Sequence, residues 1–566
     1  MPAAAHVKAH GIHYTPPELA AFLARNALSA LEGDGPLRVL DPACGDGALL
    51  EAVAKASDNP ERLTLIGMDT DSRAVAAAST RLRHLRNHVH AIELREADFL
   101  EAVADQLEPR LLDPEPALGL GEMDVVITNP PYVRTQVLGA SRAQALAATY
   151  GLRGRVDLYH AFVVASSVTL RDRGVLALLS SNRYLSTKGG ESVRRFIAAN
   201  YSLVNLVDLG DTKLFAAAVL PAILIAKRDT ATSSEYVESC PYTRIYEVRG
   251  SVAARPTDTR SHVLSAISSD HVGLLSVDNV TYEIERGELD ASQPTEPWKL
   301  SNHTTDAFLS AIESHSCAKF GDRLKIRVGI KTTADAVFIR SDWGSLPDDQ
   351  QPEPDLLLPI IQRESTSRWK TSSENSEWQV LYPYDLNQSR RHPVDLEDYP
   401  RAENYLTQHR ERLQGRQYVI DAGRKWYEIW VPQRPADWAR RKLVFPDISE
   451  TAAFSTDESG AVVNGTCYWA LAPEDDELLR VMLGVANSTL GQQYYDTVCG
   501  NRLYAGRRRY MTQYVKEFPI PFESEATRRL SKCVGELMQT DITSSDAARL
   551  EAEVDTLAAR SFGLPE

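Results

Sequence analysis

Asn129-Pro130-Pro131-Tyr132 is the part of the sequence whose residue types and order most directly suggest chemistry. It follows the strand-like segment 124–128, and its two prolines end a strand and remove two N–H donors, so the turn presents mainly carbonyl groups. The side-chain oxygen of Asn129 and the carbonyl of Pro130 would accept both hydrogens of an aromatic amine and push its nitrogen toward tetrahedral geometry. The freed lone pair could then attack a methyl sulfonium, while the ring of Tyr132 offers a face on which an extruded base stacks.

Three earlier motifs point to a nucleoside-type cofactor. Residues 39–47 form a glycine-containing turn between an expected strand and helix, where a ligand can approach the backbone closely. The spacing is not G-x-G-x-x-G and no Gly-Lys-Ser/Thr follows, which disfavours a dinucleotide site and a P-loop. Asp69 lies where a carboxylate can bind ribose hydroxyls. Asp98 can accept from an adenine amine, and Phe99 can pack on the ring. Each feature alone is compatible with an ordinary loop or helix cap, but together on successive strands they favour the cofactor site.

These motifs lie in a region where short apolar strands alternate with helix-like runs. This alternation predicts an α/β fold, with a parallel sheet covered by helices on both faces. An apolar helix is expected to begin near Thr15-Pro16. The expected strands are 38–40, 63–67, 90–94, 125–128 and 175–180, and the helices between them are 48–56, 72–85 and 157–172. Segments 203–208 and 219–226 are expected to close the sheet as an antiparallel edge pair.

The pattern changes along the rest of the chain, and we predict four parts. Residues 1–230 form the α/β domain, and 231–300, rich in Ser, Thr, Asp and Glu, form a connector with some short strands. Residues 301–522 are rich in Trp, Tyr and Arg and form a second domain. Residues 523–566 form a helical tail, in which Leu550, Val554 and Leu557 share one helix face.

Composition narrows the class of protein. A chain of 566 residues favours two large domains. Its six cysteines form no CxxC pair, so neither a zinc site nor a disulfide framework is suggested, and we expect no metal. The sequence shows no signal-peptide core and no apolar run of membrane-spanning length, so we expect a soluble, cytoplasmic protein. The net charge of −15 argues mildly against nucleic acid, but binding depends on local patches.

Residues 1–230 resemble the catalytic domain of the adenine-N6 DNA methyltransferases of restriction-modification systems, TaqI-like in layout. The matching motifs, in the order of the family's γ class, are Tyr14-Thr15-Pro16-Pro17, Asp41-Pro42-Ala43-Cys44-Gly45, Asp69, Asp98-Phe99 and Asn129-Pro130-Pro131-Tyr132. The resemblance implies a class I Rossmann-like sheet that binds S-adenosyl-L-methionine through Thr15, Asp41, Ala43, Gly45, Asp69, Asp98 and Phe99. It also implies that Asn129, Pro130 and Tyr132 hold a flipped adenine, with Phe215 as a second stacking aromatic. A core position in an edge hairpin is the alternative for Phe215.

The resemblance weakens after residue 230, where this family reads its DNA sequence. It implies that 301–522 is a target-recognition domain of mixed α+β structure that contacts double-stranded DNA. Segment 501–516 contains five cations and no acid, and we predict that Arg502, Arg507, Arg508 and Arg509 contact phosphates. Segment 424–427 mixes cations with aromatic residues, and segment 440–442 consists of three cations, as nucleic-acid-binding surfaces often do. A single basic triplet is, however, as often a solvated face.

Other functions compatible with the Asn-Pro-Pro-Tyr motif remain open. Enzymes that methylate protein glutamine or ribosomal RNA share it, but their chains are typically much shorter. An N4-cytosine DNA methyltransferase is closer, although serine is more typical of it at position 129. A DNA-binding protein on an inactive methyltransferase scaffold is disfavoured by the intact motifs. Fused nucleases usually precede the methyltransferase, so we expect a stand-alone modification enzyme, either solitary or with a separately encoded restriction endonuclease that acts on the same site.

Overall fold

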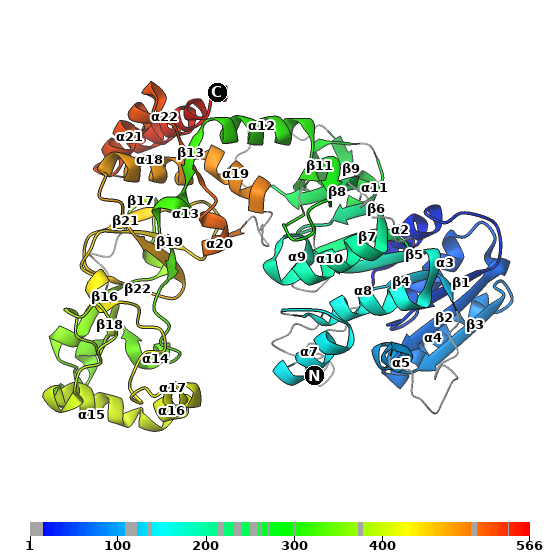
Figure 1. The fold of residues 1–566 in the computed structure, drawn as a ribbon, viewed down its shortest axis with the longest axis horizontal. Coiled ribbons are helices and arrows are strands. Elements are labelled where there is room, and N and C mark those ends of the chain that lie inside the picture. Colours follow the sequence, from blue (N-terminus) through cyan, green and yellow to red (C-terminus); the bar gives the residue numbers. More distant parts are fainter. Residues whose placement is uncertain are drawn as a thin grey trace. The chain divides into compact units, whose positions relative to one another are not determined.

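The computed structural model describes residues 15–107, 122–132, 139–154, 156–212, 214, 220–230, 239–248, 258–260, 262–269, 271–298, 300–371, 377–499, 507–541 and 543–565. These residues form two compact units (Figure 1). The first ends at His303, and the second begins at Thr304 and includes the C-terminal helices.

A large mixed sheet organises the first unit, and its parallel half carries the predicted motifs. In the described residues it has 12 strands, eleven of them in the order β3-β2-β1-β4-β5-β7-β6-β8-β11-β10-β9. The first five are parallel: β3 (Ala91–Glu96), β2 (Leu63–Asp69), β1 (Leu37–Asp41), β4 (Met123–Thr128) and β5 (Leu170–Ser181). The predicted parallel sheet is therefore confirmed.

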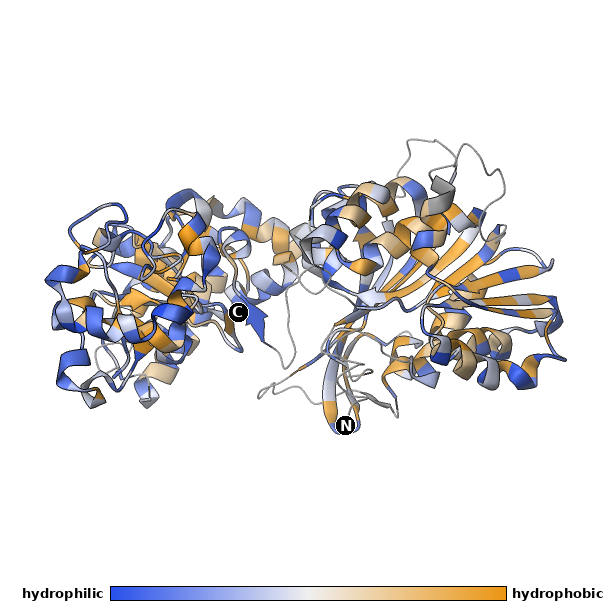
Figure 2. Ribbon diagram, turned by 90° about the horizontal axis from the view of Figure 1, so that it is seen from below, coloured by the Kyte–Doolittle hydropathy of each residue, from blue (hydrophilic) through white to orange (hydrophobic). Residues whose placement is uncertain are grey.

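Helices cover both faces of this sheet. Val39 belongs to one hydrophobic cluster and Leu40 to another, because successive side chains of a strand point to opposite faces. The first cluster includes side chains of α2 (Pro17–Ser29), α3 (Ala48–Ala56) and α4 (Ser72–Leu82). The second includes side chains of α5 (Phe99–Leu107), α8 (Leu158–Thr169), α9 (Arg183–Ser186) and α10 (Glu191–Asn200). Figure 2 shows the apolar strands between these helices.

The sheet continues beyond the predicted pair of closing strands. β6 (Tyr201–Asp208) and β7 (Pro221–Arg228) are antiparallel, as predicted, but they are not an edge. β8 (Ser239–Glu247) pairs with β6, and its apolar side chains, including Ile245, are buried. The prediction that β6 and β7 form the edge of the sheet is therefore wrong. It failed because the buried residues of β8 are interspersed with polar ones, so no apolar run in the sequence marks a further strand. The further strands and helices are β9 (Asp258–Arg260), β10 (Gly273–Val277), β11 (Val280–Asp290), β12 (Leu300–Ser301), α7 (Ala140–Thr149) and α11 (Val263–Ile267).

The second unit is mixed α+β, as predicted. One sheet has the order β14-β23-β19-β21-β17 and another β15-β18-β16-β22. Their bounds are β14 (Arg327–Val328), β15 (Ile339–Arg340), β16 (Leu357–Ile361), β17 (Trp369–Lys370), β18 (Gln379–Leu381), β19 (Lys442–Pro446), β21 (Ser455–Asp457), β22 (Val462–Val463) and β23 (Cys467–Leu471). Two short pairs complete the strands: β13 (Ser316–Lys319) with β25 (Pro519–Pro521), and β20 (Ile448–Ser449) with β24 (Arg508–Arg509).

A helical layer packs on this unit and includes the predicted C-terminal helix. Leu550, Val554 and Leu557 are buried on one face of α22 (Ser545–Ser561), which contacts α18 (Asp476–Asn487) and α21 (Glu525–Leu537). The other helices are α12 (His303–Ser314), α13 (Phe320–Arg323), α14 (Asp335–Phe338), α15 (Pro400–Gln408), α16 (Arg410–Gln414), α17 (Gln417–Asp421), α19 (Thr489–Cys499) and α20 (Thr512–Val515). Among the described residues, no helix is long and apolar enough to span a membrane.

Candidate active site

The Asn-Pro-Pro-Tyr segment begins where β4 ends, at the carboxyl edge of the parallel strands. The amide nitrogen of Asn129 donates to the hydroxyl of Thr15 at 3.0 Å. On the other side, the Tyr132 hydroxyl donates to Asn129 Oδ1 at 2.7 Å. Pro130 is buried, and Asn129 and Tyr132 are half-buried. The structure therefore brings Thr15 together with Asn129 and Tyr132, which lie more than a hundred residues further along the chain.

The glycine turn after β1 is tied to the end of β2. Gly45 N donates to Asp69 Oδ2 at 2.9 Å, and Cys44 N donates to the carbonyl of Met68 at 2.8 Å. Gly45 has φ +52° and Gly47 has φ +82°, a backbone region that favours glycine. A Cβ atom on Gly47 would also lie 3.2 Å from that of Ala78 on α4. The glycines therefore allow the chain to turn sharply against α4 while the carboxylate of Asp69 fixes the turn.

Asp98 and Phe99 begin α5 at the end of β3, but they face different surroundings. Asp98 Oδ1 accepts hydrogen bonds from the backbone of Leu100 at 2.9 Å and Glu101 at 3.3 Å, which caps the helix. Asp98 Oδ2 accepts none from the described residues, so this oxygen can receive an amine. Phe99 is 1% exposed and packs on Phe162, with ring centroids 5.7 Å apart.

Asp41 is the deeply buried carboxyl group of the site. It is 1% exposed, and Ala43 N donates to its Oδ1 at 3.2 Å. Burial, together with the nearby charges of Asp69 and Asp46, raises the pKa of Asp41 to about 8. A group of carboxylates at the ends of adjacent strands suits a ligand that carries positive charge and hydroxyl groups. This group of carboxylates thus fits a cationic nucleoside.

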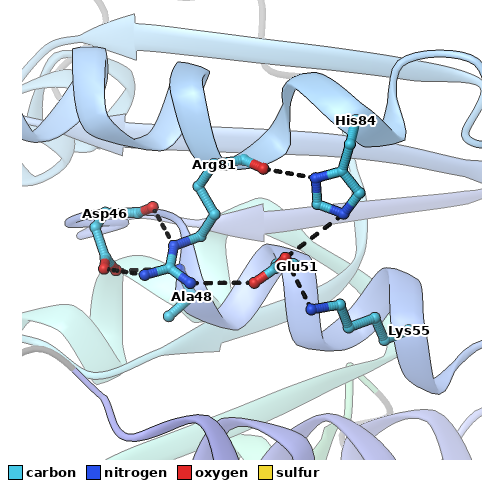
Figure 3. A network of polar contacts seen from close by, with 6 residues as sticks. All are labelled: Asp46, Ala48, Glu51, Lys55, Arg81 and His84. Carbon is cyan, nitrogen blue, oxygen red and sulfur yellow. Dashed lines mark hydrogen bonds and ion pairs between the residues drawn. The ribbon is translucent and has the colours of Figure 1, made fainter.

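Arg81 on α4 holds the glycine turn from outside. Its Nε donates to the carbonyl of Asp46 at 3.0 Å, and its Nη1 donates to Glu51 on α3 at 3.1 Å. The third nitrogen, Nη2, pairs with the Asp46 carboxylate. Glu51 also pairs with Lys55 at 2.8 Å. Figure 3 shows Arg81 between Asp46 and Glu51. One guanidinium thereby joins α4, α3 and the turn.

The sequence motifs did not reveal every residue around this site. Arg81 has no motif of its own, because its role depends on the packing of α4 against the turn. Tyr150, whose hydroxyl donates to the carbonyl of Leu100, and Phe162 lie beside the Asp98–Phe99 corner. The sequence shows the apolar run at the start of α8, but it does not show that Phe162 in this helix packs on Phe99. Phe215 and Arg502 lie outside the described residues.

The basic segment of the second unit is paired with acids. Arg508 is buried and forms two hydrogen bonds to Asp496, at 2.8 and 2.7 Å. Arg507 lies 3.6 Å from Glu450 and Arg509 3.1 Å from Asp447, and both side chains are about half exposed, at 53% and 48%. Among the described members of the predicted set, Arg507 and Arg509 are therefore accessible, whereas Arg508 makes an internal contact.

Other predicted basic surface residues also have internal partners. Lys442 is fully buried and pairs with Asp457 at 2.8 Å, so this member of the basic triplet 440–442 faces the core. Burial lowers the pKa of Lys442. In segment 424–427, by contrast, Lys425 is exposed and lies over the ring of Tyr427 at 5.6 Å.

Comparisons with known proteins relate both units to restriction-modification methyltransferases. Residues 64–215 match the Eco57I restriction-modification methylase family, and residues 381–520 match the TaqI-like C-terminal specificity domain. The chain is 35% identical to the type II methyltransferase M.BanIII of Aneurinibacillus aneurinilyticus, over 98% of this chain and 97% of that one. It is 26% identical to the type II methyltransferase M.PaeR7I of Pseudomonas aeruginosa, over 91% and 86%.

A solved structure has the same overall fold. The type IIL restriction-modification enzyme MmeI, determined in complex with DNA, aligns with a TM-score of 0.59 at 12% sequence identity. The alignment covers 94% of this chain and 70% of that chain.

We predict that Arg81→Ala loosens the glycine turn without unfolding the first unit. The two bonds to Asp46 are lost, so the amides of Cys44 and Gly47 should exchange with deuterium roughly tenfold faster. Hydrogen exchange followed by mass spectrometry measures this. Arg83→Ala, which removes an exposed arginine two residues away, is the matched control. Equal exchange in the two variants would show that Arg81 does not fix the turn.

Proposed function

The chain belongs to the type II DNA methyltransferases of restriction-modification systems, and from this we propose that it transfers a methyl group from S-adenosyl-L-methionine to the N6 amine of an adenine flipped out of double-stranded DNA. The observation that carries the proposal is the setting of Asn129. Its amide oxygen lies at the end of β4. The neighbouring strand β1 ends in Asp41, and β2, on the other side of β1, ends in Asp69. An amine acceptor and a site for a cationic nucleoside thus share one edge of the sheet.

We propose that Asn129 Oδ1 and the carbonyl of Pro130 accept the two hydrogens of the adenine amine. Holding both hydrogens turns the nitrogen lone pair away from the ring and toward the methyl donor. S-adenosyl-L-methionine would supply a methyl group on a positively charged sulfur. The incoming amine would take the place of the Tyr132 hydroxyl on Asn129 Oδ1, so the ring of Tyr132 would be released to stack on the base, with Phe215 on its other face.

The cofactor would be held by residues that the structure places along the same edge. Asp69 would receive ribose hydroxyls in addition to Gly45 N, and Asp98 Oδ2 would accept the adenine amine of the cofactor. Asp41 would face positive charge. Ala43 and Gly45 would contact the cofactor beside these carboxylates, whereas the hydroxyl of Thr15 is hydrogen-bonded to Asn129. Phe99 would contribute from the core side, where it packs on Phe162.

The choice of adenine over cytosine rests on the residue at position 129. Asparagine there is typical of adenine-specific relatives, whereas serine is more typical of N4-cytosine enzymes. Incubating unmodified genomic DNA with the protein and S-adenosyl-L-methionine, and then digesting it to nucleosides, tests the choice directly. N6-methyldeoxyadenosine in the digest supports the proposal. N4-methyldeoxycytidine alone, or methylation of RNA or protein but not of DNA, would replace it with an alternative.

We predict that Asn129→Ala slows methyl transfer by ~10²-fold or more, because it removes a preorganised acceptor at the reacting nitrogen. Affinity for S-adenosyl-L-methionine should change little, since the carboxylates of β1 and β2 remain. Single-turnover transfer and calorimetric binding separate the two effects. Near-normal turnover in this variant would contradict the proposed role of Asn129.

We predict that cofactor binding releases a proton near neutral pH. Asp41 has a pKa of about 8 in the ligand-free protein, so below that pH its carboxyl group is mostly protonated. A cationic ligand favours the ionised form, so affinity should increase as pH rises toward 8, by up to about tenfold per unit, and then level off. Calorimetry in buffers of different ionisation enthalpy measures the proton. Asp41→Asn should remove it; proton release that persists in this variant would assign it elsewhere.

The second unit would bring the DNA to this site. Its match to a specificity domain covers residues 381–520, which include Arg507 and Arg509. We propose that these two arginines contact phosphates, exchanging their carboxylate partners for the backbone of the duplex. A separately encoded restriction endonuclease acting on the same DNA site is the partner that this function implies.

We predict that Arg507→Ala/Arg509→Ala binds all DNA more weakly, with the log-log salt dependence flatter by up to about 2. Preference for the target sequence over other DNA should be retained, because phosphate contacts carry no sequence information. Fluorescence anisotropy across a salt series measures both. Arg529→Ala is the matched control, since Arg529 on α21 is 55% exposed and also pairs with a glutamate. Lost site preference with unchanged non-specific binding would mean that these arginines read bases.

A further inference from the structure

Thr15 is joined to the reacting edge of the sheet by its hydroxyl. Its Oγ1 accepts a hydrogen bond from Asn129 Nδ2 at 3.0 Å, and Thr15 is 9% exposed. The sequence motif assigns Thr15 to the cofactor, but this bond links it to the residue that would hold the substrate. The role of Thr15 in the reaction therefore needs a separate explanation.

The two ends of an asparagine amide have opposite hydrogen-bonding character and nearly the same size. Only the amide oxygen can accept a hydrogen from an amine. The amide nitrogen is itself a donor, so it would place its own hydrogens against those of the amine. The final side-chain torsion of asparagine is broad and roughly two-fold, so a half-turn exchanges the ends at little intrinsic cost. Asn129 can work as an acceptor only if neighbouring groups fix that torsion.

We infer that Thr15 is a positioning residue for Asn129: its hydroxyl holds the amide nitrogen, and this directs the amide oxygen toward the substrate amine. The inference rests on the proposed function. The Tyr132 hydroxyl, which donates to Oδ1 at 2.7 Å, favours the same orientation in the substrate-free protein. When a base takes that oxygen, Tyr132 gives up its bond while the bond from Asn129 to Thr15 is kept.

The position of Thr15 suits this task because a well-anchored helix follows it. Pro16 and Pro17 fix the backbone into the first turn of α2, and Ala20 N donates to the carbonyl of Pro16 at 2.9 Å. Leu19 and Leu23 of α2 are fully buried in the cluster that covers β1 and β4. The hydroxyl is therefore delivered from a rigid element, as a preorganised contact requires.

Thr15→Val tests the inference, because valine keeps the shape of threonine and removes only the hydroxyl. We expect single-turnover methylation at saturating DNA and cofactor to slow by about tenfold, the loss that one hydrogen bond supports. Calorimetric affinity for S-adenosyl-L-methionine should stay within about twofold. Thr15→Ser, which restores a hydroxyl, should recover most of the rate. Thr64→Val, at a buried threonine on β2 far from the carboxyl edge, is the matched control and should leave the rate unchanged.

The same substitution in an Asn129→Ser background gives an independent check. Serine has no amide nitrogen for Thr15 to hold, so Thr15→Val should cause no further loss there. If this background is too slow to measure, the recovery by Thr15→Ser and the affinity comparison decide.

Three results would overturn the inference. Weaker cofactor binding with an unchanged saturated rate would place Thr15 on the cofactor. A Thr15→Ser variant as slow as Thr15→Val would indicate packing. A full loss in the Asn129→Ser background would show that Thr15 acts independently of Asn129. Failure of the proposed function itself would be recognised earlier, by the absence of N6-methyldeoxyadenosine from DNA treated with the wild-type protein.

Discussion

The parallel pairing of β1 with β2 and β4 is the constraint on which the site depends. In a parallel sheet all strands end at the same edge, so residues at successive strand ends are brought together whatever their separation in sequence. Asp41 is paired with Gly67, two residues before Asp69, and Val39 with Val125. This register carries the Asn129 segment to the edge where the carboxylates lie. A shift of one residue would turn the alternating apolar side chains to the wrong faces, so core packing and site geometry are specified together.

The same edge concentrates negative charge at some cost to the ligand-free protein. Burying Asp41 near Asp46 and Asp69 disfavours its ionised form, which is why its pKa is raised to about 8. Arg81 offsets part of this charge from outside, where it binds Asp46 without entering the site. The acidic edge and the amine acceptor thus favour different reactants, a cationic donor and a neutral amine, at adjacent positions.

The sequence predicted the parallel sheet and the order of its motifs because strand periodicity, glycine turns and proline pairs are local signals. It did not predict the contacts that orient the motifs. The bond from Asn129 to Thr15 joins residues 114 apart, and Arg81 meets Asp46 across 35 residues. Both depend on how helices pack, which no spacing rule records. The continuation of the sheet through β8 was missed for a related reason: Arg244 and Glu285 pair across neighbouring strands, and such cross-strand pairs make a sheet segment look polar.

Charge in the second unit shows why a count of basic residues does not define a DNA-binding surface. Arg508 and its neighbours on either side are adjacent in sequence, yet strand geometry sends Arg508 inward to Asp496 and leaves Arg507 and Arg509 accessible. The alternation of buried Arg508 and exposed Arg509 along β24, with exposed Arg507 just before the strand, therefore divides one basic run into an internal ion pair and two external cations. Removing the internal arginine would break this buried ion pair with Asp496, a loss of stability that could be mistaken for a loss of DNA affinity. Only the exposed cations can report on phosphate contacts, and only when folding is measured alongside binding.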